Sequence, residues 1–571
     1  MSQSRRDFLS LSAQAVILAL GADLGFPAML QAAASNAAPP LPVPGKSGLY
    51  GLLTPTKKIT LKAAEATGAL PATGAPMLAY ATTHNGLAYL NPVLVLRKGQ
   101  TFEAELINGL TEPTIIHWHG VDCPWRQAGH PSYAIEPKTS YNYAFPITNR
   151  AGTYWYHPHP HGRTARQSYM GLASFFIVRD DEEEAFAKEL DLRLGETDIP
   201  ILIQDKRLTH DGRLEYSPSR DDLMMGYLGD TILVNGQRAP TLKTSTRIYR
   251  FRVLNGSTAR IYNLSFIMRD RQLPFTLVGN DGGFLPAPRQ IDGLFLAPGE
   301  RADILLDMSA LSPGQEVFLQ NMPFDPMHNE DSMMGMGGMM HMGNAEGSAN
   351  QQGMGAGAHG GSHGTLGEGS TYPIMRLLVD QKVAYSAKPP TNLPAMPAPR
   401  TDGIDRPITL AMRHMGGWTI NDQTFAMNSI PILVKSRGPE IWRITNATAS
   451  MPHPMHLHGY FYRVLERRGS PDQVKSRIID AMGRLPSDMG YKDTVLVWPG
   501  ETVSVSIDFA TPPYPKDQLF LFHCHNLEHA TRPRYSPPPW RPHPSARGTS
   551  GQSPSGPRKM GEHTDIRQIE I

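Results

Sequence analysis

Pairs of histidines separated by a single residue recur at four places in the chain. The pairs are His117-Trp118-His119, His157-Pro158-His159, His456-Leu457-His458 and His523-Cys524-His525. On an extended strand residues i and i+2 point the same way, so each pair would aim two imidazole rings at one place. Four such pairs favour a fold whose β-strands carry the motifs.

Short β-rich runs alternate with turn signals along the chain, for example at 92–100 and 153–156. This spacing favours all-β sandwiches or barrels. Three runs each read as a strand that ends at an asparagine, namely Asn108, Asn255 and Asn446. The sequence Pro-Gly-Glu also precedes a strand in the second and third units, at 298–300 and 499–501. These repeats imply three similar units, which we place as domains near 45–180, 190–390 and 400–530.

Composition excludes several classes of partner. Of 571 residues, 54 are Lys or Arg and 52 are Asp or Glu, so the net charge of +2 offers no broad basic surface for nucleic acid or anionic membrane. After the N-terminus no run approaches the roughly 18 apolar residues that span a bilayer. We expect small-molecule partners, no membrane span and a monomer. If Cys524 is a metal ligand, it cannot form a disulfide with the second cysteine, Cys123.

The N-terminus resembles an export signal. Ser4-Arg5-Arg6-Asp7-Phe8-Leu9 precedes a modest apolar stretch, and Ala32-Ala33-Ala34 follows as a small-residue cleavage pattern. We interpret 1–34 as a twin-arginine signal peptide, which predicts a periplasmic protein exported after folding with its cofactor. The alternatives are a plain secretory signal or an amphipathic first helix.

The ligand types indicate copper. Imidazole suits copper, and a thiolate with two histidines makes a trigonal blue-copper site for electron transfer. In His523-Cys524-His525 the cysteine points opposite to its neighbours, so one strand can bind a single copper on one side and a cluster on the other. Zinc usually takes three or four ligands in a closed tetrahedral set. Eight paired histidines, with Cys524, His453 and His529 besides, exceed that number. We interpret four further histidines as structural or ordinary polar residues: His84, His130, His161 and His414.

The segment 327–364 is rich in Met, Gly and His and has almost no β-branched residues. It cannot form a packed core, so we expect a mobile loop. Thioethers are soft ligands that prefer Cu(I), which suggests capture of cuprous ion as substrate. The alternative is an insertion with no role. The candidate ligands are Met333, Met334, Met336, Met339, Met340 and Met342.

The four histidine motifs, in this order, resemble those of the multicopper oxidases, and the surrounding sequence is most similar to the bacterial cuprous oxidase and laccase branch. The similarity extends from about residue 50 to 529. Supporting stretches include 156–167, Met170-Gly171-Leu172-Ala173, Ile203-Gln204-Asp205-Lys206 and Tyr491-Lys492-Asp493-Thr494-Val495.

This resemblance implies three cupredoxin-like Greek-key β-sandwich domains and four copper ions, with a cluster between the first and third domains. It implies one-electron oxidation of a substrate coupled to four-electron reduction of dioxygen to water. The type 1 ligands would be Cys524, His453 and His529, and the type 2 ligands His117 and His456. The type 3 pair would be held by His119, His157, His159, His458, His523 and His525.

The chain departs from the family pattern in three places. Related cuprous oxidases bind substrate copper with an acidic residue and a methionine before the first type 1 histidine; here Met451 fits, but the acidic position is Ala449. Relatives often carry a proton-delivering acid in an Asp-Gly pair, where this chain has Ala128-Gly129, and Asp122 is the nearest substitute. Relatives also have an axial methionine and a final strand after the last histidine.

At the axial position, ten residues beyond Cys524, this chain has Arg534, which offers no lone pair to copper. The strand pattern is lost in the Pro/Arg-rich tail 531–571, which we interpret as a shifted reading frame or an unusual natural tail. We therefore expect the third domain to lack its closing strand. Two other functions stay open: a laccase that oxidises phenols, and a non-catalytic periplasmic protein that sequesters copper.

Overall fold

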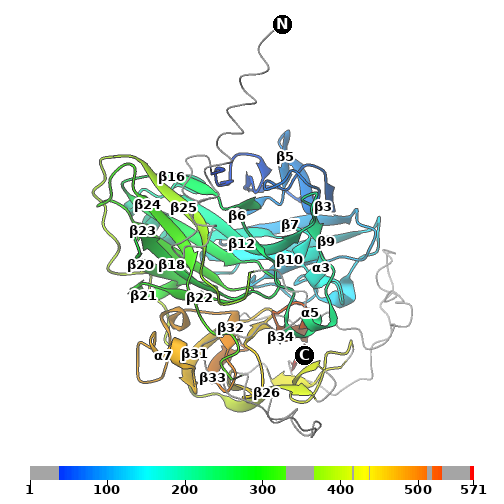
Figure 1. Ribbon diagram of the computed structural model, residues 1–571. Helices are drawn as coiled ribbons and strands as arrows, with labels where there is room; N and C mark the ends of the chain where they lie inside the picture. Colours follow the sequence, from blue (N-terminus) through cyan, green and yellow to red (C-terminus); the bar gives the residue numbers. More distant parts are fainter. Residues whose placement is uncertain are drawn as a thin grey trace, which may run out of the picture. The chain divides into compact units, whose positions relative to one another are not determined.

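The computed structural model describes residues 38–329, 366–413, 417–427, 429–435, 438–510, 517–529 and 566–570. The chain divides into two units, 1–38 and 39–571, and all the described strands and helices belong to the second. The described strands form six sheets, two for each of three β-sandwiches, which Figure 1 colours blue to cyan, green, and yellow to red. The predicted all-β fold of three cupredoxin-like domains is confirmed.

The first sandwich has sheets in the orders β1-β5-β4-β3-β7-β9 and β2-β6-β11-β10-β8. Its strands are β1 (Gly48–Leu49), β2 (Leu52–Leu53), β3 (Ile59–Ala66), β4 (Met77–His84), β5 (Leu87–Leu90), β6 (Val93–Arg97), β7 (Thr101–Asn108), β8 (Ile116–His119), β9 (Ser140–Pro146), β10 (Gly152–Pro158) and β11 (Ser174–Arg179). Short helical segments are η2 (Pro131–Tyr133), α3 (Thr164–Tyr169) and α4 (Asp181–Glu189), the last leading into the second sandwich.

The second sandwich has sheets in the orders β15-β14-β12-β17-β23-β20-β21, with β13 beside β12, and β16-β25-β24-β18-β19, with β22 beside β18. Its strands are β12 (Asp198–Leu208), β13 (Leu214–Glu215), β14 (Thr231–Val234), β15 (Gln237–Arg238), β16 (Thr241–Ser245), β17 (Ile248–Asn255), β18 (Tyr262–Met268), β19 (Arg271–Leu273), β20 (Phe275–Asn280), β21 (Gly283–Ile291), β22 (Leu294–Leu296), β23 (Arg301–Asp307), β24 (Glu316–Asn321) and β25 (Tyr372–Gln381). One short helix, α5 (Arg220–Met225), precedes β14.

The third sandwich has sheets in the orders β27-β26-β29-β33-β31 and β28-β35-β34-β30-β32. Its elements are β26 (Ile404–Arg413), β27 (Gly417–Ile420), β28 (Ile432–Lys435), β29 (Pro439–Asn446), β30 (His453–Leu457), β31 (Tyr462–Arg468), α7 (Asp472–Lys475), η3 (Pro486–Met489), β32 (Thr494–Val497), β33 (Thr502–Asp508), β34 (Gln518–Cys524) and β35 (Ile566–Glu570). Within the described residues, no helix is long and apolar enough to cross a membrane.

Each sandwich contains a strand that ends at a buried asparagine, as the repeats predict. The strands are β7, β17 and β29. In each case the side-chain amide donates hydrogen bonds to two main-chain carbonyls, those of Arg260 and Leu296 for Asn255. Because these bonds satisfy buried backbone groups at the end of the strand, the asparagine fixes the turn that follows.

A final strand closes the third sandwich, so the expectation that this strand is missing is wrong. β35 lies between β28 and β34, antiparallel to the first and parallel to the second. Its five residues follow a long Pro/Arg-rich run and are too few for their pattern to stand out in the sequence. Residues 530–565, including Arg534, lie outside the described part of the chain.

The substitution Ile569→Ala tests the role of β35. The Ile569 side chain is 0% exposed and belongs to the hydrophobic core to which the first and third sandwiches contribute. We expect its truncation to lower the free energy of unfolding by about 2–5 kcal/mol, measured by chemical denaturation. Leu433→Ala on the neighbouring β28 is the control, since Leu433 is 58% exposed and should cost roughly 0.5 kcal/mol or less. Equal losses in the two variants would contradict this placement of β35.

Candidate metal centre

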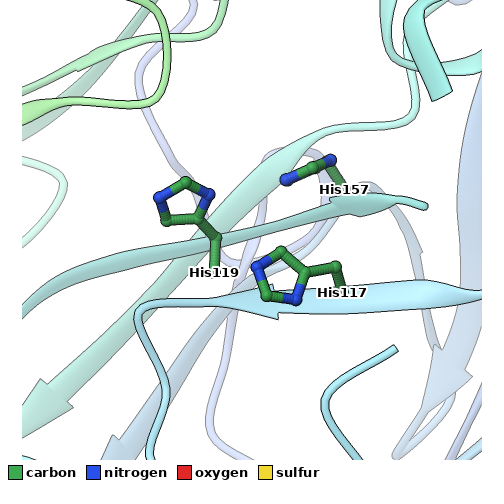
Figure 2. Close-up of side chains that lie close together, drawn as sticks. All are labelled: His117, His119 and His157. Carbon is green, nitrogen blue, oxygen red and sulfur yellow. The ribbon is translucent and has the colours of Figure 1, made fainter. Parts of the chain in front are cut away.

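The histidine pairs lie on or at the ends of four strands: β8 contains both members of its pair, whereas His159, His458 and His525 directly follow β10, β30 and β34. In the first sandwich β8 and β10 are antiparallel neighbours and place His117 opposite His157. In the third sandwich β30 and β34 place His456 opposite His523 in the same way. Figure 2 shows His117 and His119 on one strand with their rings on the same side, close to His157 from the next. The intervening Trp118 points the other way, into the core, where its ring lies 5.1 Å from that of Phe102.

The paired histidines of the first and third sandwiches meet in one cluster. The rings of His117 and His458 stack with centroids 3.7 Å apart, and those of His119 and His456 at 3.8 Å. The His525 ring lies 5.4 Å from that of His157. Three sets made up of these histidines alone have ligand atoms within 4.8 Å of one another: His117, His119 and His157; His117, His456 and His458; and His159, His458 and His523. We call the eight paired histidines the histidine cluster.

Hydrogen bonds to main-chain carbonyls orient several of these rings. The Nδ1 atom of His117 lies 2.6 Å from the Ala128 carbonyl oxygen, and that of His456 lies 2.8 Å from the Asp493 carbonyl oxygen. His157 and His523 make similar contacts through Nδ1, at 3.0 Å. A carbonyl can only accept, so Nδ1 carries the proton and Nε2 offers its lone pair. The Nε2 atoms of His117 and His456 are 3.3 Å apart.

Burial makes the histidine cluster a set of neutral donors. It lowers the pKa of His117 to about 3 and that of His523 to about 4. Nε2 of His157 and both ring nitrogens of His525 have no hydrogen-bond partner among the described residues. Because unpaired buried polar atoms are costly, these nitrogens fit a bound metal ion that takes their lone pairs. The residues therefore suit copper, for which imidazole is a preferred ligand.

A second donor set lies on the other side of β34. Cys524, His453 and His529 have ligand atoms within 4.8 Å of one another. Nδ1 of His453 is 3.4 Å from Cys524 Sγ, and its Nε2 faces Ser450 Oγ at 3.2 Å. Burial raises the pKa of Cys524 to about 12, so a metal ion must displace the thiol proton when it binds. Both cysteines are free, in agreement with the sequence.

Two neighbouring elements cover this second set. The Trp418 ring on β27 lies 4.7 Å from the His453 ring and 5.5 Å from that of His529. Helix α5 ends beside the set, and the Met224 carbonyl accepts hydrogen bonds from Trp418 Nε1 at 2.8 Å and His529 Nε2 at 3.1 Å. Figure 1 shows α5 next to β34. With Nε2 bonded to a carbonyl, His529 presents Nδ1 as its metal-binding atom.

Sequence reasoning missed the contribution of the second sandwich. Asp493 Oδ1 accepts from His119 Nε2 at 2.9 Å and from Arg301 Nη1 at 2.7 Å. Arg301 begins β23, and its main-chain N–H also donates to Asp281. All these groups are buried. The bond to Asp493 leaves Nδ1 of His119, which has no partner among the described residues, for metal.

A glycine lets the second sandwich approach the histidine cluster. A Cβ atom on Gly299 would lie 3.0 Å from the His525 ring and 3.2 Å from the His119 ring, and the residue has φ +86°. The sequence signals were present: Gly299 belongs to the repeated Pro-Gly-Glu, and Asp493 to the stretch that resembles the family. What the sequence did not show is that these two segments meet at the histidines.

The remaining predicted residues lie apart or outside the described chain. Asp122 contacts Thr148 and Asn149, and no hydrogen bond joins it to the histidine cluster in the described residues. Burial raises the pKa of Asp122 to about 7, so it can hold a proton near neutral pH, and its catalytic role stays a prediction. Met451 is buried two residues before His453. The six methionines at 333–342 are outside the described residues.

Replacing Arg301 tests the buried ionic support of the histidine cluster. Arg301→Met removes the cation that Asp493 and Asp281 share, so we expect the free energy of unfolding of the metal-free protein to fall by about 3–5 kcal/mol. Arg443→Met is the control, because its ion pair with Asp405 is half exposed and should contribute about 0–1 kcal/mol. If both variants lose the same small amount, the buried pair does not support the fold as described.

Comparison with known proteins agrees with this geometry. Family models described as multicopper oxidase match residues 73–183 and 401–534. A laccase from Bacillus subtilis (strain 168) is 31% identical over 449 residues, which cover 73% of this chain and 77% of the laccase. The multicopper oxidase mco of Staphylococcus haemolyticus (strain JCSC1435) is 30% identical over 444 residues, covering 77% of this chain and 79% of that protein.

A solved structure shows the same arrangement of strands. The McoA multicopper oxidase from the hyperthermophile Aquifex aeolicus superposes with a TM-score of 0.71 and 31% sequence identity, over 94% of this chain and 100% of that one. The relatives are thus similar along most of their length, and the donor sets that the family motifs predict lie together in this fold. The chain belongs to the multicopper oxidase family and is a copper-dependent oxidoreductase that uses dioxygen.

Proposed function

We propose that this protein oxidises cuprous ion and passes the electrons to dioxygen, which is reduced to water. Four copper ions would take part. The type 1 ion would be held by Cys524, His453 and His529, and the type 2 ion by His117 and His456. The type 3 pair would be held by His119, His157, His159, His458, His523 and His525. Bound copper supplies the one-electron redox chemistry.

The position of Cys524 between two cluster histidines is the observation that carries this proposal. Its Sγ atom faces His453, whereas the His523 and His525 rings face the histidine cluster. The two donor sets are therefore joined through the bonds of three consecutive residues. A short covalent path of this kind suits transfer of electrons from a substrate-facing site to a dioxygen-facing site. A protein that only stored copper would need no such connection.

The protein buries the histidine cluster and keeps its rings neutral, and it leaves the type 1 set accessible. All members of the histidine cluster except His523 are buried, and their lowered pKa values keep the lone pairs available for copper at neutral pH. A cavity of about 100 Å³ reaches Cys524, His453 and His529 beside Trp418 and Phe425. This cavity gives a small reductant access to the type 1 set.

Methionines in the sequence and beside the type 1 set support cuprous ion as the reductant. The sequence supplies six in the segment 333–342, and Met451 lies two residues before His453. Helix α5 adds Met224 and Met225, whose carbonyls accept hydrogen bonds from His529 and Asn526. Soft thioether ligands favour Cu(I) over Cu(II). With the twin-arginine motif at Ser4–Leu9, these features support a periplasmic enzyme that contributes to copper tolerance, and we propose that it acts as a monomer.

Phenol oxidation is the second candidate function. It is favoured by the similarity to laccases and by Ala449, which stands where related cuprous oxidases carry an acidic substrate ligand. Sequestration of copper without turnover is a third possible role. The measurements below separate the three functions.

Cys524→Ala is expected to abolish both the type 1 copper and turnover. Copper-loaded protein should show a blue thiolate-to-copper absorbance at about 600 nm and should consume dioxygen in the presence of reductant. The variant should lose the absorbance and the oxygen uptake, because no thiolate remains to bind the type 1 copper or to carry electrons to the histidine cluster. Cys123→Ala is the matched control: Cys123 is buried and belongs to none of the donor sets found among the described residues, so both signals should persist. Blue protein that consumes no dioxygen would indicate sequestration.

Replacing the six methionines at 333–342 with leucine distinguishes the two substrates. Leucine keeps the apolar volume but removes the soft sulfur, so kcat/KM for cuprous ion should fall about tenfold or more, while phenol oxidation stays unchanged. The control is the double variant Met412→Leu and Met482→Leu, in which two exposed methionines elsewhere are replaced. Equal loss of the two activities, or no loss of either, would rule out a substrate role for the segment.

A further inference from the structure

One tight turn recurs directly before a strand in each of the three sandwiches. It spans 97–100 before β7, 297–300 before β23 and 498–501 before β33. In each turn the main-chain N–H of the first residue donates a hydrogen bond to the side-chain oxygen of the last, at 3.0 Å for Gln100, 2.7 Å for Glu300 and 3.0 Å for Glu501. Gln100 is neutral, so closing the turn requires a side-chain acceptor but no charge.

The two charged turns differ in the origin of the cation that pairs with them. Glu501 is paired with Arg467 of β31, in its own sandwich, with 3.1 Å between Oε2 and Nη1. Glu300 is paired with Lys492, which belongs to the third sandwich, with 3.0 Å between Oε1 and Nζ. All four side chains are buried. The second sandwich therefore takes the cation for its turn from a neighbouring sandwich.

Lys492 also contacts a second carboxylate of the second sandwich. Its Nζ atom lies 3.1 Å from Asp281 Oδ2, so one ammonium serves both Asp281 and Glu300. Asp281 in turn accepts the main-chain N–H of Arg301, which directly follows the turn, at 2.8 Å. The main chain of Lys492 is itself fixed by hydrogen bonds to Tyr462. The turn is therefore held at Glu300 and, through Asp281, at Arg301.

The turn that Lys492 holds touches the histidine cluster, whereas its equivalent in the third sandwich does not. A Cβ atom on Gly299 would lie 3.0 Å from the His525 ring and 3.2 Å from the His119 ring. These two rings come from the third and first sandwiches, and their centroids are 5.1 Å apart. A Cβ atom on Gly500 would have no histidine within 4 Å among the described residues. Gly299 thus lies where all three sandwiches meet.

We propose that Lys492 is a positioning residue for the type 3 copper pair. The inference rests on the ligand assignment of the proposed function, in which His119 and His525 both hold that pair. Lys492 pairs with Glu300 and thereby keeps Gly299 against both rings. Its side chain fixes how closely a ligand from the first sandwich approaches one from the third. Lys492 needs no contact with a metal ligand, because it acts through the turn.

The contact with the turn matters because hydrogen bonds do not fix the His525 ring. Neither of its ring nitrogens has a hydrogen-bond partner among the described residues. Before copper binds, packing sets the orientation of this ring, and Gly299 is one of the residues that pack against it. If Lys492 lost its charge, the buried Glu300 carboxylate would keep no cation among the described residues, which is strongly unfavourable. The turn would then move, and the ring would lose part of its support.

The variant Lys492→Met, studied as copper-loaded full-length protein, tests this role. Methionine keeps most of the side-chain length and removes the charge. Electron paramagnetic resonance should then detect type 3 copper, whose two ions are magnetically coupled and give no signal when correctly spaced. Competition with a chelator should show copper affinity lower by about tenfold or more. The blue absorbance of the type 1 ion should persist, which reports a folded chain, and Lys492→Arg should restore the silent pair.

Arg467→Met is the matched control, since it removes the buried cation of the equivalent turn, which touches no histidine. The type 3 pair should stay silent in this variant. A milder comparison uses Glu300→Gln and Glu501→Gln, because glutamine can still accept the hydrogen bond that closes each turn and loses only the charge. Type 3 copper should become detectable in Glu300→Gln alone. This second pair of variants decides the question if Lys492→Met does not fold.

Hydrogen exchange of the copper-free protein provides a readout that does not depend on copper. The amides of 297–301 should exchange faster in Lys492→Met and Glu300→Gln than in the unmodified chain. A silent type 3 pair in both of these variants would overturn the proposal. An equal change in the controls would also overturn it, because it would indicate a general loss of packing. If the unmodified copper-loaded protein has no silent pair, the ligand assignment of the proposed function fails together with this inference.

Discussion

The alternation of side chains along β34 is the constraint on which the rest of the site depends. Because successive residues of a strand face opposite sides, Cys524 joins His453 and His529 while His523 and His525 join the histidine cluster. One residue more or fewer would reverse both assignments at once. The pairing of β34 with β30 fixes this register, since Cys524 lies opposite Met455 and His523 opposite His456. The strand pairing that forms this sheet therefore also decides which side chains enter each donor set.

Burying eight imidazole rings together is electrostatically unfavourable if any of them is charged, and two features of the fold keep them neutral. Carbonyl acceptors at Ala128 and Asp493 hold ring protons on Nδ1, so the rings stay neutral and their Nε2 lone pairs point inward. The buried Asp493 carboxylate fixes His119 in the opposite orientation and is itself balanced by Arg301. Buried ions without such partners would cost several kcal/mol each. The metal-free site is thus organised before copper binds, and some of its ring nitrogens have no partner among the described residues.

The sequence predicted those parts of the molecule that follow from local spacing. Each histidine pair needs only the two-residue period of a strand, and Asn108, Asn255 and Asn446 mark the same turn in each sandwich because their amides satisfy local carbonyls. Contacts between distant segments left no such signal. Arg301 and Asp493 are 192 residues apart, and their pairing depends on how two sandwiches dock. The closing strand β35 is five residues long after a Pro/Arg-rich run, so its pairing with β34 is visible only in the fold.

The second sandwich, which has none of the histidine pairs, has a larger role than a spacer. Its Pro-Gly-Glu turn places Gly299 against His119 and His525, and Arg301, which directly follows the turn, bonds to Asp493. Its helix α5 bonds His529 through the Met224 carbonyl, and Tyr216 reaches Glu528 from the same domain. The donor sets come from the first and third sandwiches, but the second touches both of them. A change in how it docks would therefore alter ligand orientation in both donor sets, which the bonds of Cys524 also join.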